Sequence, residues 1–143
     1  MVELRVLDVD EWNLWRDLRL AALEESPDAF GATYASWVDA DEGRWRKRLA
    51  KPSFNVVALL EGEYAGMVSG LPGEERVDLM SLWVAPFARG IGVGDALVRR
   101  VVEWAAPKPV ALRVNAGQEH ANALYLRNGF VEVADGLLVK VPG

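Results

Sequence analysis

The hydrophobic periodicity of this sequence changes at Val84, and no other feature constrains the fold as strongly. Before that residue the chain holds three β-rich runs joined by short turns, at residues 54–60, 64–71 and 76–84. Short connections between consecutive strands predict antiparallel pairing. After Val84, a glycine-rich loop leads into a segment with helical spacing of apolar residues (94–105) and then into another β-rich run (110–114). A strand, a helix and a strand in this order predict a right-handed parallel crossover, so the sheet should be mixed.

The segments on either side extend this sheet and add helices. Residues 2–7 alternate apolar and polar side chains, which predicts a half-buried strand. Asp8 and Glu11 have the spacing of a capping box, at the start of a helix that should end near Pro27. Further helices are expected over 39–50 and 117–128, and a final hairpin over 130–133 and 137–141. The sequence therefore predicts one α/β (α+β) domain over residues 1–143, with a mixed, mostly antiparallel sheet of about seven strands flanked by about four helices.

The composition of the chain excludes several functions. Lys and Arg number 16 against 21 Asp and Glu, which gives a formal net charge of −5 and argues against sequence-independent binding of nucleic acid. The absence of cysteine excludes thiolate zinc sites and a cysteine nucleophile, and the single histidine, His120, excludes a multi-histidine metal site. The N-terminal residues contain no signal-peptide pattern, and no stretch approaches the ~20 apolar residues of a membrane helix. We therefore expect a cytoplasmic protein that uses no metal and binds neither nucleic acid nor membrane.

A glycine-rich loop lies between the third strand of the meander and the helix that follows it. Three glycines, Gly90, Gly92 and Gly94, leave backbone N–H groups free of neighbouring side chains, so that an anion can approach closely. The first turn of the helix contributes about half a positive charge, and Arg89 adds a full one. The loop therefore predicts a site for a phosphate or diphosphate, and the alternative is a tight turn without a ligand.

The spacing of the glycines distinguishes between the known phosphate-binding loops. The dinucleotide fingerprint would require Gly or Ala where this chain has Asp95 or Leu97, and a P-loop would require a lysine that is absent here. The chain instead has Arg-x-x-Gly-x-Gly, formed by Arg89, Gly92 and Gly94. This pattern resembles the pyrophosphate loop of the GNAT superfamily of acetyl-CoA-dependent N-acetyltransferases.

A second segment resembles the next motif of the same superfamily. It reads Leu112-x-Val114 and then Ala121-x-x-Leu124-Tyr125-x-x-x-Gly129-Phe130. The two motifs cover residues 78–130 in the order that the family has. The family usually has Asn three residues before this alanine, whereas the chain has Gln118 there, and Asn115 or Asn122 could take the same role.

The resemblance implies transfer of an acetyl group from acetyl-CoA, a cosubstrate, to a primary amine of a small molecule or peptide, as in bacterial members. The residues that it implies for binding acetyl-CoA are Leu82, Trp83, Val84, Arg89, Gly90, Ile91, Gly92, Val93, Gly94, Gln118 and Asn122. Dimers are common in the family, so a homodimer could complete the acceptor cleft. The alternative function is an acyl-CoA-binding sensor without turnover, and the glycine spacing disfavours a nucleotide-binding protein.

Two residues occupy the catalytic positions that the resemblance implies. Tyr125 matches the tyrosine that protonates the departing thiolate, and its alternative is a core position beside Leu124. Asp78 occupies the position of a glutamate that relays the amine proton in many members, and its shorter side chain would require a bridging water. Its alternative is a solvent-facing strand residue. Ser81 is a weaker candidate for the same role.

Two further groups of residues relate to the acceptor. A basic run is formed by Arg44, Arg46, Lys47 and Arg48. It predicts a solvated helix face or, alternatively, a rim that steers an acidic acceptor or the CoA phosphates. Aromatic residues that either line the acceptor cleft or belong to the core are Tyr34, Trp37 and Trp83.

Overall fold

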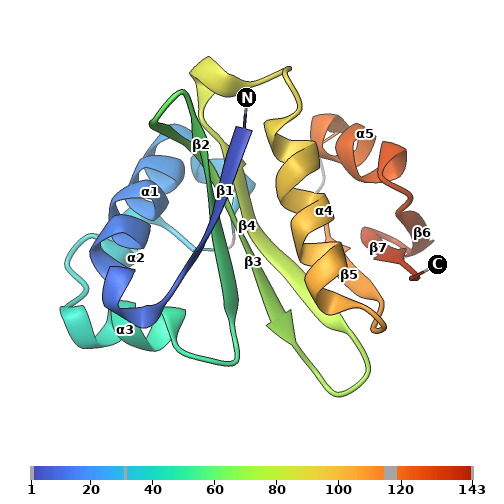
Figure 1. Ribbon diagram of the computed structural model, residues 1–143, viewed down its shortest axis with the longest axis horizontal. Coiled ribbons are helices and arrows are strands. Elements are labelled where there is room, and N and C mark those ends of the chain that lie inside the picture. Colours follow the sequence, from blue (N-terminus) through green and yellow to red (C-terminus); the bar gives the residue numbers. More distant parts are fainter. Residues whose placement is uncertain (1, 31, 115–118, 143) are drawn as a thin grey trace.

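The computed structural model describes residues 2–30, 32–114 and 119–142, and its centre is a seven-stranded sheet (Figure 1). The strands are β1 (Val2–Leu7), β2 (Phe54–Leu60), β3 (Glu63–Pro72), β4 (Val77–Val84), β5 (Val110–Arg113), β6 (Val131–Ala134) and β7 (Leu137–Lys140). They lie in the order β1-β2-β3-β4-β5-β7-β6. The pairing of β4 with β5 is parallel and the other pairings are antiparallel. The structure thus confirms the predicted mixed, mostly antiparallel sheet of an α/β (α+β) fold.

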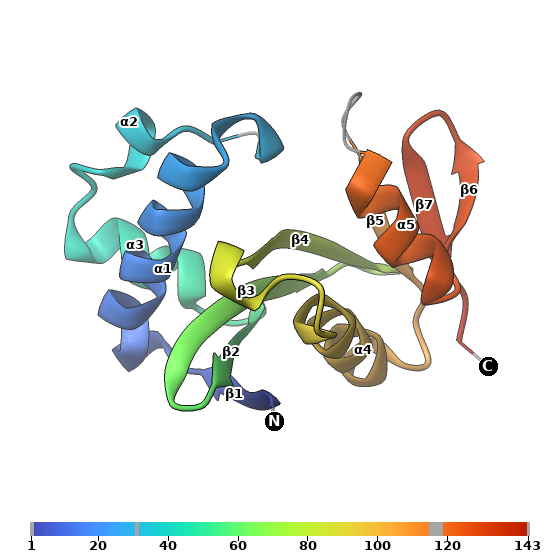
Figure 2. The same ribbon diagram turned by 90° about the horizontal axis from the view of Figure 1, so that it is seen from above.

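Helices lie on both faces of this sheet (Figure 2). The described residues form α1 (Trp12–Glu25), α2 (Tyr34–Trp37), α3 (Glu42–Leu49), α4 (Val93–Ala105) and α5 (Glu119–Arg127), with short 3-10 turns η1 (Val9–Glu11), η2 (Pro27–Ala29) and η3 (Pro86–Ala88). The helix that the sequence did not predict is α2. It is a single turn, stabilised because the side chain of Thr33 accepts a hydrogen bond from the backbone N–H of Ser36 (3.2 Å).

Two hydrophobic cores fill the space between the sheet and the helices, because successive side chains of a strand point to opposite faces. In β2, Val56 and Ala58 belong to the core under α4, whereas Val57 belongs to the core under α1 and α3. Trp15 of α1 and Trp45 of α3 are the largest fully buried side chains of this second core. The sheet is therefore covered on both faces, and β4 has one core on each side.

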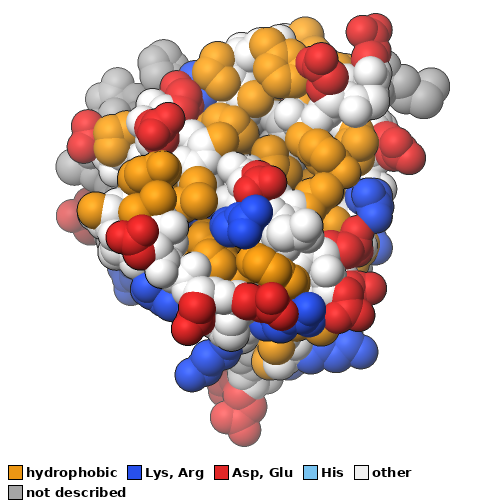
Figure 3. Space-filling model, turned by 90° about the vertical axis from the view of Figure 1, so that its left-hand side faces the viewer, with side chains coloured by type: hydrophobic (Ala, Val, Ile, Leu, Met, Phe, Trp, Pro, Cys, Tyr) orange, Lys and Arg blue, Asp and Glu red, His pale blue; other side chains and the backbone are white. Residues whose placement is uncertain are grey.

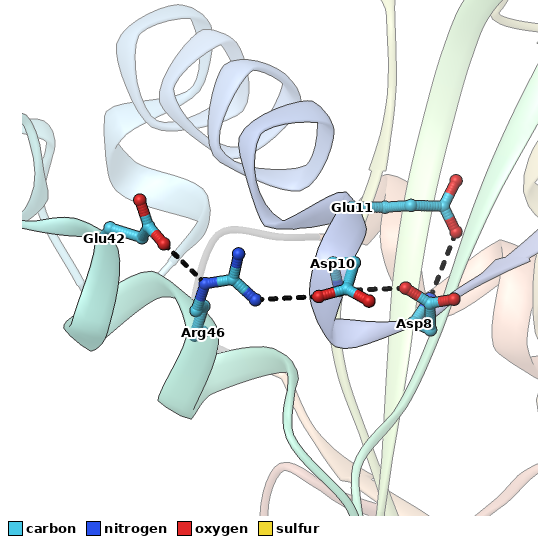
Figure 4. Close-up of polar contacts among 5 residues, drawn as sticks. All are labelled: Asp8, Asp10, Glu11, Glu42 and Arg46. Carbon is cyan, nitrogen blue, oxygen red and sulfur yellow. Dashed lines mark hydrogen bonds and ion pairs between the residues drawn. The ribbon is translucent and has the colours of Figure 1, made fainter.

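The predicted capping box before the first helix is present (Figure 4). The side chain of Asp8 accepts from the backbone N–H of Asp10 (2.8 Å), and the N–H of Asp8 donates to Glu11 (3.2 Å). Arg46 of α3 bridges Glu42 (2.7 Å) and Asp10 (2.9 Å), so it joins α3 to η1. Figure 3 shows the outer face over these helices, where acidic and basic side chains lie interspersed among hydrophobic ones.

Candidate active site

β4 and β5 run side by side at their beginnings and then separate (Figure 2). Among the described residues they pair at Val77 with Val110 and at Asp78 with Ala111. β4 remains paired with β3 as far as Val84. Within the ranges that the structure describes, the other backbone edge of β4 has no strand partner beyond Asp78, and its N–H and C=O groups can bond a ligand instead.

A β-bulge lies in this part of β4. The register between β3 and β4 shifts by one residue between Met67 and Ser69, so that β4 places two residues, Ser81 and Leu82, opposite one residue of β3. Ser81 has a φ of +59°, in the left-handed region that serine rarely adopts. The sequence carries no signal for this bulge, because its residues fit a regular strand.

The bulge determines which way the side chains of β4 point. Leu82 and Val84 pack against the core under α4. Ser81 points to the opposite face, where its hydroxyl accepts a hydrogen bond from Arg48 of α3 (3.2 Å), and Trp83 belongs to the core on that face. One side of β4 therefore faces the glycine turn and α4, and the other faces α1 and α3.

The glycine turn connects β4 to α4 through η3. Gly90 and Gly92 have φ values of +81° and +92°, so a side chain at either position would be strained. α4 begins at Val93, and Gly92 before it offers no side chain to cap the N–H groups of the first turn. Ile91 between the glycines is exposed, whereas Val93 is buried. The first-turn amides are thus free for an anion at the positive end of the helix dipole.

Arg89 is tied to other parts of the protein. Its Nε donates to the carbonyl of Val84 (2.9 Å) and its Nη2 to Glu25 at the end of α1 (2.6 Å). Hydrogen bonds from Ser26, Trp83 and Arg89 lower the pKa of Glu25 to about 2. The carboxylate of Glu25 therefore balances much of the positive charge that the sequence analysis assigned to a predicted phosphate site. An anion at this turn would then be held mainly by the backbone amides.

The first turn of α4 is also joined to the end of α5. A Cβ on Gly94 would lie 3.2 Å from Cδ2 of Leu124, so glycine allows the two helices to approach closely. Asp95 accepts two hydrogen bonds from Arg127 and one from Asn128, each 2.8 Å long. The hydrogen bond with Arg127, together with that from Asn128, lowers the pKa of Asp95 to about 2 despite an opposing effect of burial.

Tyr125 of α5 lies in the core under α4. It is 7% exposed, and its ring meets the ring of Phe130 edge-on with the centroids 5.7 Å apart. Burial raises the pKa of its phenol well above the usual value near 10. The phenol therefore keeps its proton at neutral pH, which is the form that a proton donor needs. The two interpretations of the sequence are compatible, because a tyrosine packed in this core is also a protonated one.

Asp78 stands at the point where β4 and β5 part. Its neighbours Val77 and Leu79 belong to the core under α4, so its side chain points to the face that also carries Ser81. The carboxylate is half exposed and pairs with Arg76 (3.1 Å). It is thus open to solvent and to a bridging water.

The expected contacts from α5 are described in part. Gln118 and Asn115 lie outside the described residues, and so does the side chain of His120. Asn122 is half-buried and precedes Tyr125 by three residues, so the two side chains share one face of α5.

Of the basic run, Arg48 differs most from the solvated helix face that the sequence predicted. Within the basic run, Arg46 lies outside and pairs with acids, but Arg48 turns inward. Its guanidinium donates to Asn55 (3.0 Å), Ser69 (2.9 Å) and Ser81 (3.2 Å). A signal was present in the sequence, because Arg48 follows Trp45 by three residues and therefore borders the apolar stripe of its helix.

The aromatic residues that the sequence linked to the acceptor are divided between core and surface. Trp83 is buried, and its Nε1 donates to Glu25 (3.0 Å). Trp37 packs against Trp45, with ring centroids 4.7 Å apart. Tyr34 is exposed.

In the described part of the chain, no group of three or more His, Asp or Glu side chains is placed to hold a metal ion. No helix in those ranges is long and apolar enough to cross a membrane.

An open strand edge, a glycine turn at a helix start and a buried tyrosine thus converge on one region. Over residues 12–130 the sequence matches the family described as acetyltransferase (GNAT) family. The chain belongs to the GNAT family. No curated protein is significantly similar to it in sequence.

Solved GNAT structures share the fold over the whole chain. An acetyltransferase of the GNAT family from Streptococcus pneumoniae superposes with a TM-score of 0.78 at 19% identity, with 100% of each chain covered. The PaiA N-acetyltransferase of Thermoplasma acidophilum, in complex with coenzyme A, gives 0.79 at 15% identity, with 99% of each covered. A ribosomal-protein-alanine N-acetyltransferase from Brucella melitensis gives 0.75 at 21% identity, with 98% of this chain and 99% of that one covered. These similarities establish a GNAT fold.

Proposed function

We propose that this GNAT protein is an acetyl-CoA-dependent N-acetyltransferase that acts on a primary amine of a small molecule or peptide. The observation that supports this proposal best is the separation of β4 from β5 beyond Asp78, directly beside the glycine turn. A long cosubstrate with a diphosphate can then bond the amides at the start of α4 and lay its arm along the open edge of β4. Two similar structures are N-acetyltransferases by name, and one of them contains coenzyme A.

Binding uses backbone groups more than side chains. The amides after Gly92 would hold the diphosphate, and the free edge of Leu82, Trp83 and Val84 would bond the amides of the pantetheine arm. A pantetheine arm bonded to this edge would bring the thioester near the bulge of β4. Holding the thioester beside the amine can by itself supply roughly 7–11 kcal/mol of the reduction in barrier.

The chemical step then requires two proton transfers. The amine nitrogen attacks the thioester carbonyl, and the sulfur takes the proton of the Tyr125 phenol as the C–S bond breaks. The two events must be concerted, because a phenol is a weaker acid than a thiol. The amine loses its proton to Asp78 through a bridging water. Tyr125 then regains its proton from solvent, and Asp78 releases the proton it received.

The proposal is tested by thiol release from acetyl-CoA over a broad panel of amines. We expect release with a subset of amines and loss of coenzyme A binding in Gly92→Asp, because the new carboxylate would lie against the amides that hold the diphosphate. Gly62→Asp is the matched control, since Gly62 also has a positive φ (+84°) and open space around it but lies in the β2–β3 turn. Tight coenzyme A binding without release on any amine would point to a sensor instead.

The role of Asp78 gives a separate prediction. In Asp78→Asn, kcat/KM should fall about 10²-fold and its pH profile should shift, because the group that accepts the amine proton is gone. The measurement is kcat/KM against pH for the best amine of the panel. Glu75→Gln, an exposed change in the preceding turn, is the control. An unshifted profile in Asp78→Asn would remove this residue from the mechanism.

A further inference from the structure

Arg48 turns its positive charge inward, and among the described residues it has no acidic partner. Its three hydrogen-bond acceptors, the side chains of Asn55, Ser69 and Ser81, are all neutral. The guanidinium also lies over the ring of Trp15, with its Cζ 5.2 Å from the ring centroid. Neutral oxygens and an aromatic ring hold the side chain in place but leave its charge uncompensated.

Arg19 of α1 adds a second such charge next to the first. Its Nη1 is buried and has no hydrogen-bond partner in the described part of the chain. Its Cζ lies 4.6 Å from the centroid of the Phe30 ring. Burial, together with the nearby charge of Arg48, lowers the pKa of Arg19 to about 10, so it is still a cation at neutral pH.

Two neighbouring guanidinium groups without a carboxylate between them lower the stability of the folded protein. In the described residues neither arginine takes part in an ion pair, whereas Arg5, Arg16, Arg46, Arg76, Arg89 and Arg127 all do. Burying a charge is costly unless it is paired. A forked donor left unpaired matches the geometry of a carboxylate, which accepts two parallel hydrogen bonds.

The position of this pair relates it to the reaction. Arg48 touches the bulge of β4 through Ser81, on the face toward α1 and α3, which is also the face of Asp78. The glycine turn lies at the start of α4, which packs on the opposite face of the sheet. The arginines therefore lie on the side from which an amine would approach the thioester, and not at the diphosphate site.

We propose that Arg19 and Arg48 form a subsite for a carboxylate of the acceptor, so that the substrate is an amine that also carries a carboxylate. This inference rests on the proposed N-acetyltransferase function and narrows its substrate class. Arg48, held in place by three neutral side chains, supplies the fixed charge. Arg19 supplies its Nη1, which has no hydrogen-bond partner among the described residues.

The test compares amino acids of increasing length, from glycine through β-alanine and γ-aminobutyrate to lysine, with the carboxamide of each. In the wild type, at least one acid should be acetylated with a kcat/KM ten-fold or more above that of its amide. In Arg19→Gln the preference for the acid over its amide should disappear. The KM for the acid should rise 10- to 100-fold, whereas kcat and the rate on the amide should not change. Arg16→Gln, on the outer face of the same helix and paired with Asp17 (3.0 Å), should retain the preference.

A thermal-shift measurement separates this inference from the proposed function. The preferred acid should raise the melting temperature of the wild type and of Arg16→Gln but not that of Arg19→Gln, and its amide should raise none of them. Turnover of amines with equal rates for acids and amides would overturn the carboxylate subsite and leave the N-acetyltransferase function standing. A shift by the acid without thiol release on any amine would support the subsite and overturn the function.

Discussion

Tyr125 combines core packing with the protonation state that the proposed reaction requires. Its ring fills the core under α4, and the same burial keeps its phenol protonated, because the phenolate is disfavoured away from water. The raised pKa also has a consequence for stability. Above pH 10 the unfolded chain loses this proton while the folded chain keeps it, so this residue makes folding less favourable as the pH rises beyond that value.

The change Tyr125→Phe removes the proton donor and leaves the ring in place. We expect kcat to fall by ~10²–10⁴-fold with little change in the KM for acetyl-CoA, because the hydroxyl acts on the departing thiolate and not on the bound cosubstrate. Steady-state kinetics measures both quantities. Tyr64→Phe, on β3, is the control, since its hydroxyl accepts a long hydrogen bond from Arg5 (3.5 Å). An unchanged kcat in Tyr125→Phe would exclude this role.

At the scale of the element, the bulge of β4 depends on Ser81. A residue other than glycine in the left-handed region destabilises the fold by about 1–2 kcal/mol. Ser81 has this conformation, but its hydroxyl also stabilises the fold by accepting a hydrogen bond from Arg48. Ser81→Ala loses the hydrogen bond and keeps the strain, whereas Ser81→Gly loses both. We expect Ser81→Gly to be the more stable of the two by about 0.5–1 kcal/mol after the entropy cost of glycine, as measured by urea denaturation.

At the neighbouring residue Met80 we expect the opposite order of stability for the glycine and alanine variants. Met80 is exposed and has no positive φ, so Met80→Gly should be less stable than Met80→Ala by about 0.5–1 kcal/mol. The same order of stability at both positions would contradict a left-handed residue at 81.

The joint between α4 and α5 depends on Asp95. Its folded pKa is about 2 against a usual 3.8, so its contribution to stability is present above pH 3.8 and is lost as the pH falls toward 2. In Asp95→Asn we expect a loss of about 1 kcal/mol at pH 7 that vanishes near pH 2. Chemical denaturation at several pH values measures it. Asp17→Asn, at an exposed ion pair, should show no such pH-dependent loss.

At the scale of the whole molecule, binding at the glycine turn should be visible as stability. A ligand at 100 times its dissociation constant adds about 2.7 kcal/mol, which for a domain of this size raises the melting temperature on the order of 5–10 °C. We expect this shift with coenzyme A in the wild type and in Gly62→Asp, but not in Gly92→Asp. An equal shift with ATP would favour a nucleotide-binding protein and contradict the proposed cosubstrate.

The local features of this protein could be read from its sequence, because they depend on neighbouring residues. The periodicity at Val84 predicted the strands and the crossover helix, and the glycine spacing at 90–94 located the turn that the structure places at the start of α4. Helix ends were less accurate. The helix expected from residue 39 begins at Glu42, since Asp41 caps it by accepting from the N–H of Arg44 (2.9 Å).

The tertiary structure alone decided how charged and polar groups far apart in the sequence are paired. Arg89 meets Glu25 across 64 positions of sequence, and Arg48 meets Ser81 across 33. These partners depend on how the helices pack on the sheet and on the bulge in β4. Neither feature produces a periodic pattern in the amino-acid sequence. The sequence by itself determined most of the helices and strands and the glycine turn, because these follow from local backbone chemistry. The parting of β4 from β5 and the buried arginines were decided only when distant segments packed together.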